Sequence, residues 1–373
     1  GLCIHGVQVL GTIAQVPHLA ARQRADLVVI AIHDAGQKRL NEIFDVCLES
    51  GARIQILPDV VAQLDGSNGL PGPRDLTIED LVGRLPREVD EAACRSLVEG
   101  RVVLVTGAAG SIGSELCRQL ACYAPAQVLA LDQDETGLYD LDLELRSSDC
   151  PPVLLVGDVA NQERMGTIWR RYRPQVVFHC AAYKHVPILE AFPTEALWTN
   201  VQGTLTVARC AQRWGTERFV LVSSDKAACP ANVMGASKRV GELLAMAVQG
   251  EDGTRFSVVR FGNVLGSRGS VVPTFEREIA RGGPVTITHP QMKRFFMSIE
   301  EAVSLVIQAG AYTTGGDLFI LDMGEEVRIE DLARKMIRLR GLRVGKDVAI
   351  EYVGVRPGEK LSERLFCPVC ETL

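Results

Sequence analysis

The stretch Val102-Val-Leu-Val-Thr-Gly-Ala-Ala-Gly-Ser-Ile-Gly113 is the most informative segment of this chain of 373 residues. Its apolar beginning predicts a buried strand over residues 102–106, and Gly107, Gly110 and Gly113 predict a tight turn that opens a helix. Glycine allows the unusual backbone angles of such a turn and lets the main chain approach a pyrophosphate closely. A glycine triplet alone can be an ordinary turn, but a strand before it and a helix after it favour a dinucleotide site.

Two aspartates that follow this turn, Asp132 and Asp158, stand at or just after the ends of apolar runs, where they could contact a bound dinucleotide. Asp132 ends the next apolar run, roughly 20 residues beyond Gly113, which is the spacing at which a carboxylate binds the adenosine ribose. A carboxylate there would repel a 2′-phosphate, so we expect NAD rather than NADP. A helix cap or a solvated loop acid is the alternative interpretation of Asp132. Asp158 stands after the following apolar run and is predicted either to contact adenine or to be a turn aspartate.

Strand and helix patterns alternate regularly beyond the turn. Further strands are predicted over residues 127–131, 153–156, 176–180, 219–223 and 256–261. Such alternation predicts parallel strands joined by right-handed helical crossovers, which is a doubly wound α/β sheet of the Rossmann type. We assign residues 100–373 to this domain and expect its last part, mainly residues 262–373, to form an interleaved substrate lobe.

The residues before the turn have a weaker pattern. Residues 1–75 predict a small αβ domain like a partial nucleotide-binding domain, with strands over 27–32 and 53–57 and a helix over 37–50. It contains no glycine-rich phosphate loop. Residues 66–74 are rich in Gly and Pro and predict a loop, and residues 76–99 are expected to be a linker and a helix.

Composition narrows the class of protein. The apolar and charged fractions of 47% and 23% are typical of a globular chain, and the net charge of -6 does not favour a nucleic-acid partner. No run approaches the roughly 18 apolar residues of a membrane span, and no signal peptide is evident. We therefore expect a cytoplasmic protein that meets a membrane only through segments absent from this chain, since Gly1 indicates a piece of a longer one.

Irregularly spaced cysteines predict reduced thiols, and Cys367-x-x-Cys370 lacks the second pair that a metal site needs.

Polar residues follow the strand predicted over residues 219–223. Ser224, Asp225 and Lys226 stand where sheets of this kind place their chemistry, at the carboxyl end of a central strand. A helix is predicted to begin near Met234, so Met234 and Lys238 share one helical face. An Asp-Lys pair at a strand end is by itself equally typical of a surface ion pair.

These segments resemble the extended short-chain dehydrogenases/reductases, a family marked by a Tyr-x-x-x-Lys pair. Lys238 matches the lysine, which in the family binds the nicotinamide ribose, whereas Met234 stands at the tyrosine position of the active site. The departure removes the usual base for a substrate hydroxyl. It argues against simple dehydrogenase or epimerase activity.

Six stretches are more closely similar to the CapD-like bacterial nucleotide-sugar 4,6-dehydratases, which tolerate this substitution. They are residues 106–116, 181–187, 223–227, 234–238, 260–270 and 356–360. The resemblance implies tightly bound NAD, a UDP-N-acetylglucosamine substrate and a UDP-6-deoxy-4-keto product, with retention at the fifth carbon, in surface glycan synthesis. The first region resembles a degenerate domain that follows membrane helices in long members of the group.

The implied reaction expels water from the sugar beside a hydride that passes to NAD and returns. It needs an acid and a base, and Asp225 and Lys226 are expected in these roles, in that order. Asp225 would then hold a proton and Lys226 would lack one, which burial favours. Ser224 is expected to bond the 4-hydroxyl in place of the missing phenol.

Further candidates lie in the same stretches. Cofactor contacts are expected from Ser111, Ile112, Val159, Ala181, Ala182, Lys184, Asn200 and Lys238, in addition to the three glycines and Asp132 and Asp158. Substrate contacts are expected from Lys184, His185, Asn263, Arg294, Arg356 and Glu359, because arginine suits phosphate. Each charged residue alone can instead be a solvated surface group, and His185 can be structural.

Two other functions remain open from the sequence. A UDP-sugar 4-epimerase would share the fold and cofactor, although Met234 argues against it. A redox-sensing module would bind NAD without turnover, but it would need neither Asp225-Lys226 nor the basic substrate residues. We also expect a homo-oligomer, because this fold often pairs through two helices.

Overall fold

The computed structural model describes residues 2–32, 35, 37–57, 72–82, 87–250 and 253–367. The chain forms two compact units. The first combines Gly1–Leu85 with Val271–Met292 and Val327–Gly354, and the second combines Pro86–Ser270 with Lys293–Glu326 and Val355–Leu373. Two segments of the expected substrate lobe thus pack with the N-terminal residues. The domain boundaries at 75/76 and 99/100 stay predictions.

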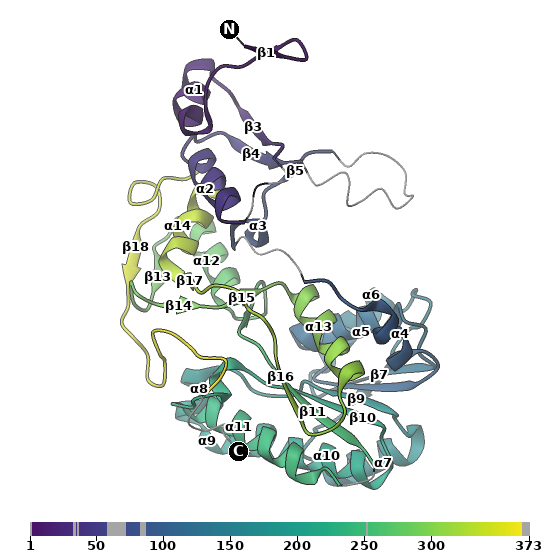
Figure 1. Ribbon diagram of the computed structural model, residues 1–373. Coiled ribbons are helices and arrows are strands. Elements are labelled where there is room, and N and C mark those ends of the chain that lie inside the picture. Colours follow the sequence, from purple (N-terminus) through teal and green to yellow (C-terminus); the bar gives the residue numbers. More distant parts are fainter. Residues whose placement is uncertain are drawn as a thin grey trace. The chain divides into compact units, whose positions relative to one another are not determined.

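The second unit is built on a seven-stranded parallel sheet, in the order β16-β11-β10-β9-β6-β7-β8 (Figure 1). The strands are β6 (Val102–Thr106), β7 (Gln127–Asp132), β8 (Val153–Val156), β9 (Val176–His179), β10 (Arg218–Val222), β11 (Arg255–Arg260) and β16 (Asp317–Ile320). The predicted doubly wound α/β sheet is confirmed. Each strand predicted in this domain is present within one residue of its expected bounds, and β16 is an additional strand.

Helices cover both faces of this sheet (Figure 1). One face carries α4 (Glu91–Val98), α5 (Ser111–Ala121), α6 (Glu135–Leu145) and α13 (Ile299–Tyr312), and the other carries α7 (Gln162–Tyr172), α10 (Thr204–Arg213) and α11 (Val233–Val248). The period-2 alternation of the strands explains the two layers. Val103 and Val105 of β6 join one apolar cluster, while Leu104 between them joins the other.

The strand order reverses at β6, which pairs with β7 on one side and with β9 on the other. The connections that leave β6 and β9 therefore diverge to opposite faces of the sheet. A crevice opens between such loops at the carboxyl ends of the strands, and ligands of doubly wound sheets bind there. The glycine-rich turn directly follows β6.

The first unit contains a smaller sheet. Strand β3 (Leu27–Ile30) pairs in parallel with β4 (Arg53–Ile56), and β5 (Arg74–Asp75) adds antiparallel to β4. Its helices are α1 (Val16–Gln23), α2 (Gln37–Leu48), α3 (Ile78–Val82), α12 (Val271–Ala280) and α14 (Ile329–Leu339). Buried Ile30, Phe44 and Ile54 form a core to which Leu339 of α14 adds. The small αβ fold is as expected, and most of the predicted 66–74 loop lies outside the described residues.

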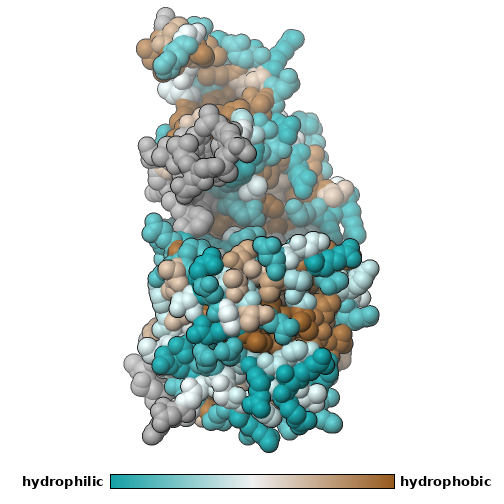
Figure 2. All heavy atoms as spheres, turned by 90° about the vertical axis from the view of Figure 1, so that its right-hand side faces the viewer, coloured by the Kyte–Doolittle hydropathy of each residue, from teal (hydrophilic) through white to brown (hydrophobic). Residues whose placement is uncertain are grey.

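Short elements complete the fold. They are β1 (Cys3–Ile4), β2 (Val7–Gln8), η1 (Ile13–Gln15), α8 (Val186–Ala191), α9 (Pro193–Ala196), η2 (Leu197–Gly203), η3 (Asp225–Ala227), β12 (Asn263–Val264), β13 (Val285–Ile287), β14 (Lys293–Arg294), β15 (Phe296–Met297), β17 (Val327–Arg328) and β18 (Ile350–Tyr352). None of the helices in the described ranges is both long and apolar enough to span a bilayer. Hydrophobic residues lie among hydrophilic ones on the face in Figure 2. The cysteines that the structure describes are free thiols.

Candidate active site

The turn after β6 has no room for side chains. Gly107 has a φ of +70°, and a Cβ added to it would lie 2.7 Å from the backbone nitrogen of Ala181, at the end of β9. A Cβ on Gly113 would lie 2.1 Å from the carbonyl oxygen of Gly107. Gly110 is the N-cap of α5, which begins at Ser111. The glycines thus bring β9 and the start of α5 against one narrow turn, and the positive end of the helix faces the crevice.

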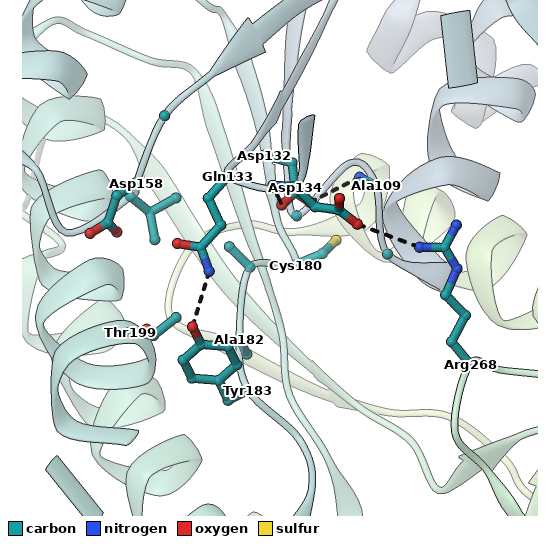
Figure 3. Close-up of a pocket in the computed structure, with 15 residues that line it drawn as sticks. Ala109, Asp132, Gln133, Asp134, Asp158, Cys180, Ala182, Tyr183, Thr199 and Arg268 are labelled. Carbon is teal, nitrogen blue, oxygen red and sulfur yellow. Dashed lines mark hydrogen bonds and ion pairs between the residues drawn. The ribbon is translucent and has the colours of Figure 1, made fainter. Parts of the chain in front are cut away.

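A cavity of about 270 Å³ lies at the reversal of strand order (Figure 3). Several of the predicted cofactor residues line it, namely Gly107, Gly110, Asp132, Asp158, Val159, Ala181 and Ala182. Gln133, Tyr183, Thr199 and Arg268 also line it, and the sequence reasoning did not include them. Gln133 directly follows β7, and Tyr183 lies four residues beyond the end of β9, so the strand-end rule was a sufficient signal for both. Thr199 and Arg268 carry no such signal.

Two of the acidic residues that line the cavity, Asp132 and Asp158, are held by hydrogen bonds from the chain itself. Asp132 Oδ2 accepts from the backbone N–H of Ala109 at 2.9 Å, and its Oδ1 accepts from that of Asp134 at 3.0 Å. Asp158 Oδ1 accepts from the backbone N–H of Ala160 at 2.8 Å, and its Oδ2 accepts from the indole N–H of Trp198 at 3.1 Å. Both carboxylates are therefore fixed in place before any ligand is bound.

The cavity has two ends in Figure 3. Asp158 and Thr199 lie on one side, which we call the Asp158 end, and Ala109 and Arg268 lie on the other, which we call the Arg268 end. Between them the side-chain amide of Gln133 donates to the Tyr183 hydroxyl at 3.1 Å.

The Arg268 end is held against the start of α5. The backbone N–H of Arg268 donates to Ser111 Oγ at 3.0 Å. The Arg268 guanidinium lies 3.7 Å from Asp134 Oδ2. The cation and the helix N-terminus make this end suited to a diphosphate.

Other predicted cofactor residues lie outside the cavity lining. Ile112 packs against an apolar core cluster. The buried Asn200 side chain bonds to the backbone N–H of Tyr183 at 2.8 Å, to its carbonyl at 3.0 Å and to Ser237 Oγ at 2.9 Å. All the donors of this amide are used, so Asn200 holds the Tyr183 loop rather than presenting a free group to a ligand.

Lys238 is buried one turn inside α11. Its Nζ donates to the carbonyl oxygen of Val222, at the end of β10, at 2.6 Å. Burial lowers the pKa of Lys238 from 10.5 to about 8, against the opposing effects of Cys180 and Glu242. Cys180, whose charge acts on Lys238, lines the cavity, whereas Lys238 itself does not.

The residues after β10 form a close cluster. Asp225 is fully buried, and its Oδ1 accepts from Lys226 Nζ at 2.9 Å and from Ser224 Oγ at 2.8 Å. Asp225 Oδ2 is buried without a hydrogen-bond partner. Lys226 Nζ also donates to Asn263 Oδ1 at 3.4 Å, and its side chain is 17% exposed. The pair is thus not the solvated ion pair of the alternative interpretation, because one carboxyl oxygen is left for a ligand or a proton.

The helix that carries Lys238 packs tightly against this cluster. A Cβ on Gly235 would lie 2.4 Å from the carbonyl oxygen of Lys226, so only glycine lets α11 approach η3 this closely. Met234, beside it, is buried in an apolar cluster with Val186, Leu189 and Ala196. The residue at the tyrosine position is therefore part of a small core.

Two of the substrate candidates lie near the cavity. Burial and the neighbouring charge of Arg268 lower the pKa of Lys184, and burial and Lys184 lower that of His185. The His185 ring fills the space beside Gly269, where an added Cβ would lie 2.8 Å from its Cε1. Lys184, His185 and Arg268 thus form a basic group between the loops that follow β9 and β12.

The remaining substrate candidates lie apart from this group. Arg294 is buried and donates to the carbonyl oxygens of Lys293 and Leu361. Arg356 is exposed, and its backbone N–H donates to Glu359 Oε2 within one turn. Among the described residues, neither arginine forms a hydrogen bond or ion pair with Asp225 or Lys226.

Gly358, between Arg356 and Glu359, ties this turn to the start of α11. Its carbonyl oxygen accepts from the side chain of Asn232, the N-cap of α11, at 2.8 Å.

As for metal ligands, the described part of the chain contains no cluster of three or more His, Cys, Asp or Glu that suits an ion. Cys370 of the Cys-x-x-Cys motif lies outside the described residues.

Comparison with known proteins identifies the family. A family model described as "Polysaccharide biosynthesis protein" matches residues 103–370. The chain belongs to this family. The Staphylococcus aureus capsular polysaccharide biosynthesis protein CapD is 43% identical over 366 residues, which cover 96% of this chain and 61% of that protein. The chain is thus a CapD-like extended short-chain dehydrogenase/reductase, and it spans about three fifths of the length of this relative.

Shorter members of the family are covered more completely. A Campylobacter jejuni protein named UDP-N-acetylglucosamine 4,6-dehydratase (inverting) is 34% identical over 272 residues, 72% of this chain and 78% of its own. A Rickettsia bellii UDP-glucose 4-epimerase is 35% identical over 272 residues, 71% of this chain and 77% of its own. The structure of Pen from Bacillus thuringiensis superimposes with a TM-score of 0.69 at 34% identity, covering 73% of this chain and 84% of that one.

Proposed function

We propose that this chain is a nucleotide-sugar 4,6-dehydratase that binds NAD and converts UDP-N-acetylglucosamine to a UDP-6-deoxy-4-keto sugar for polysaccharide synthesis. The observation that carries the proposal is the buried Asp225 carboxyl group. One of its oxygens is 2.9 Å from Lys226 Nζ, and the other is buried without a partner. Buried polar atoms are nearly always satisfied, so an orphaned carboxyl oxygen at a strand end indicates a group that acts on a ligand.

The cavity fits a dinucleotide. Gly107 and Gly113 keep the turn narrow, because side chains there would collide with the backbone, and the N-terminus of α5 and Arg268 supply positive charge for a diphosphate. Asp132 would accept from the ribose hydroxyls with its remaining lone pairs, which favours NAD over NADP. When bound, NAD⁺ would accept a hydride from the fourth carbon of the sugar and return it to the sixth.

The residues after β10 supply the proton transfers of the dehydration. A ketone at the fourth carbon makes the proton on the fifth carbon acidic, and Lys226 Nζ is the base that removes it. Asp225 delivers a proton to the departing 6-hydroxyl, which leaves as water. The 4-hydroxyl also gives up its proton as its carbon is oxidised, and the fifth carbon takes a proton back when the hydride returns to the sixth. Two protons are therefore taken from the sugar and two are given. Ser224 Oγ bonds the 4-oxygen, and Lys238 binds the nicotinamide ribose. Proton transfers of this kind typically contribute 10²–10⁴-fold to the rate.

Other observations bear on the nucleotide and on the geometry of the product. A family member named for UDP-N-acetylglucosamine and basic residues in the 262–373 region support a UDP-sugar, with Asn263 and His185 on the sugar side and Arg294, Arg356 and Glu359 on the nucleotide side. Met234 favours retention at the fifth carbon, whereas the named relative is an inverting enzyme. A cytoplasmic location and self-association stay predictions.

A UDP-sugar 4-epimerase is the second candidate, since relatives of similar identity carry that name. That chemistry depends on a phenol beside the nicotinamide, and here Met234 is packed in an apolar cluster. An NAD-binding module without turnover is the third candidate. It offers no reason for the orphaned Asp225 oxygen beside Lys226.

One experiment separates these functions. The protein is incubated with UDP-N-acetylglucosamine in heavy water, and the sugar is followed by NMR. We expect a 6-deoxy-4-keto sugar with deuterium at the fifth carbon, and the couplings there give the stereochemistry. A 4-epimer formed without loss of water would favour the second candidate. Unchanged sugar in a sample that binds NAD would favour the third.

A further inference from the structure

The π-helix η2 reaches several walls of the cofactor cavity at once. Trp198 donates to Asp158 after β8, Thr199 lines the cavity, and Asn200 holds Tyr183 after β9. π-Helical turns are rare and often mark functional sites. A Cβ on Gly203 would lie 2.7 Å from Val159 Cγ2, so this glycine lets η2 pack closely against the loop after β8. The geometry gives Trp198 a place beside the cavity that no sequence motif indicated.

The Asp158 end lies across the cavity from the Arg268 end, which is the end suited to a diphosphate. In Figure 3, Asp158 and Thr199 lie across the cavity from Ala109 and Arg268, and Asp132 and Gln133 lie between. A dinucleotide with its diphosphate at the start of α5 and its ribose at Asp132 would place its purine at the Asp158 end.

The bonding of Asp158 determines what this end can recognise. Each of its carboxylate oxygens accepts one hydrogen bond, from the Ala160 N–H at 2.8 Å and from the Trp198 indole N–H at 3.1 Å. Each oxygen keeps a further lone pair, and a carboxylate only accepts. The group can therefore take a donor such as the 6-amino group of adenine, and it repels a carbonyl oxygen at the same position.

We propose that Trp198 is a positioning residue for purine selection: its indole N–H holds the Asp158 carboxylate in the orientation that accepts the 6-amino group of adenine. The role rests on the proposed function, because it assumes that the cavity binds NAD. Trp198 is 53% exposed, so its contribution is the hydrogen bond rather than a place in the core. Replacement by Phe removes that bond and keeps an aromatic ring.

The test compares the binding of NAD and of nicotinamide hypoxanthine dinucleotide, in which a carbonyl replaces the 6-amino group, by titration calorimetry. A hydrogen bond to a charged group is worth about 1.5–3 kcal/mol, so the wild-type chain should bind NAD roughly tenfold more tightly or better. In Trp198→Phe the NAD affinity should fall about tenfold, and the affinity for the hypoxanthine analogue should stay within about twofold. Trp198→His, which keeps a ring N–H, should regain part of the preference.

Leu197→Ala is the matched control, because Leu197 is the exposed neighbour on η2 and does not line the cavity. It should leave both affinities unchanged. Equal weakening of both dinucleotides by Trp198→Phe, or an unchanged preference, would overturn the role of Trp198 and leave the proposed cofactor standing. A wild-type chain that binds neither dinucleotide would overturn both.

Discussion

The cofactor cavity and the residues after β10 lie on the same sheet, yet they hold their polar groups differently. In the cavity, both oxygens of Asp132 and of Asp158 accept hydrogen bonds from the chain. After β10, Asp225 keeps a buried oxygen without a partner, and Lys238 is buried with a lowered pKa. The first region is organised to receive a ligand, whereas the second contains one unsatisfied carboxyl oxygen and a buried amine with a lowered pKa, which a reaction can use.

The largest expected effect comes from the pair after β10. Asp225→Asn and Lys226→Ala should each lower the dehydration rate by about 10³-fold, within the range for a lost acid or base. NAD affinity should stay within about twofold, because neither residue lines the cavity. Product formation by NMR and titration of NAD measure the two effects. Asp140→Asn, at an exposed position of α6, is the control. Turnover near that of wild type in either variant would remove the catalytic assignment.

Lys238 should make stability depend on pH. Its pKa is about 8 in the folded chain and 10.5 in the unfolded chain. Between these values the unfolded chain holds more protons, so the free energy of unfolding rises with pH across this window. The rise is about 3 kcal/mol for this group. Urea unfolding of wild type and Lys238→Met at pH 7.5 and 10 measures it, and the variant should show a smaller increase. Equal increases in both chains would contradict the burial of a charged Lys238.

The same substitution, glycine to alanine, tests the two regions separately, because one tightly packed glycine lies in each. Gly113→Ala would place a Cβ 2.1 Å from the Gly107 carbonyl oxygen, and Gly235→Ala would place one 2.4 Å from that of Lys226. Overpacking of this kind costs about 1–3 kcal/mol. We expect the first variant to lose NAD affinity, and the second to keep it while losing turnover. Calorimetry and the NMR assay distinguish them.

Gly166 on α7 provides the control for these substitutions, because an added Cβ there meets nothing within 4 Å. Gly166→Ala should raise stability by about 0.5–1 kcal/mol, since alanine favours helix. A loss of NAD affinity in Gly235→Ala as large as that in Gly113→Ala would show that the two regions do not act separately.

The smallest expected effect concerns cofactor choice. Asp132→Asn removes the charge that opposes a 2′-phosphate and weakens the bonds to the Ala109 and Asp134 backbones. NAD affinity should fall about tenfold, and the difference between NAD and NADP should narrow. Titration of both cofactors measures it. An unchanged ratio of the two affinities would show that the bonds to Ala109 and Asp134 account for the whole role of Asp132.

Local pattern was sufficient for much of this protein. The β6 strand and its three glycines predicted the turn, the alternation of apolar runs predicted the sheet, and the strand-end rule placed Asp132 and Asp158 in one crevice. Missed residues depend on contacts between distant segments. Arg268 lines the cavity from a loop, and Trp198 bonds the lining carboxylate of Asp158 from a π-helix, and no short-range periodicity marks either segment. Asn200 was expected to touch the cofactor, but its amide is used within the chain.

The order of residues thus specified the strands, the phosphate-binding turn and the chemical types available at each strand end, because these follow from backbone geometry over a few neighbours. Only the folded chain determined which groups have partners. Whether Asp225 is a solvated ion or a buried group with a free oxygen depends on the segments that pack over the end of β10, and one of them is α11, which approaches Lys226 closely at Gly235. Burial and bonding are sums over segments that are far apart in the chain, and no local pattern contains them.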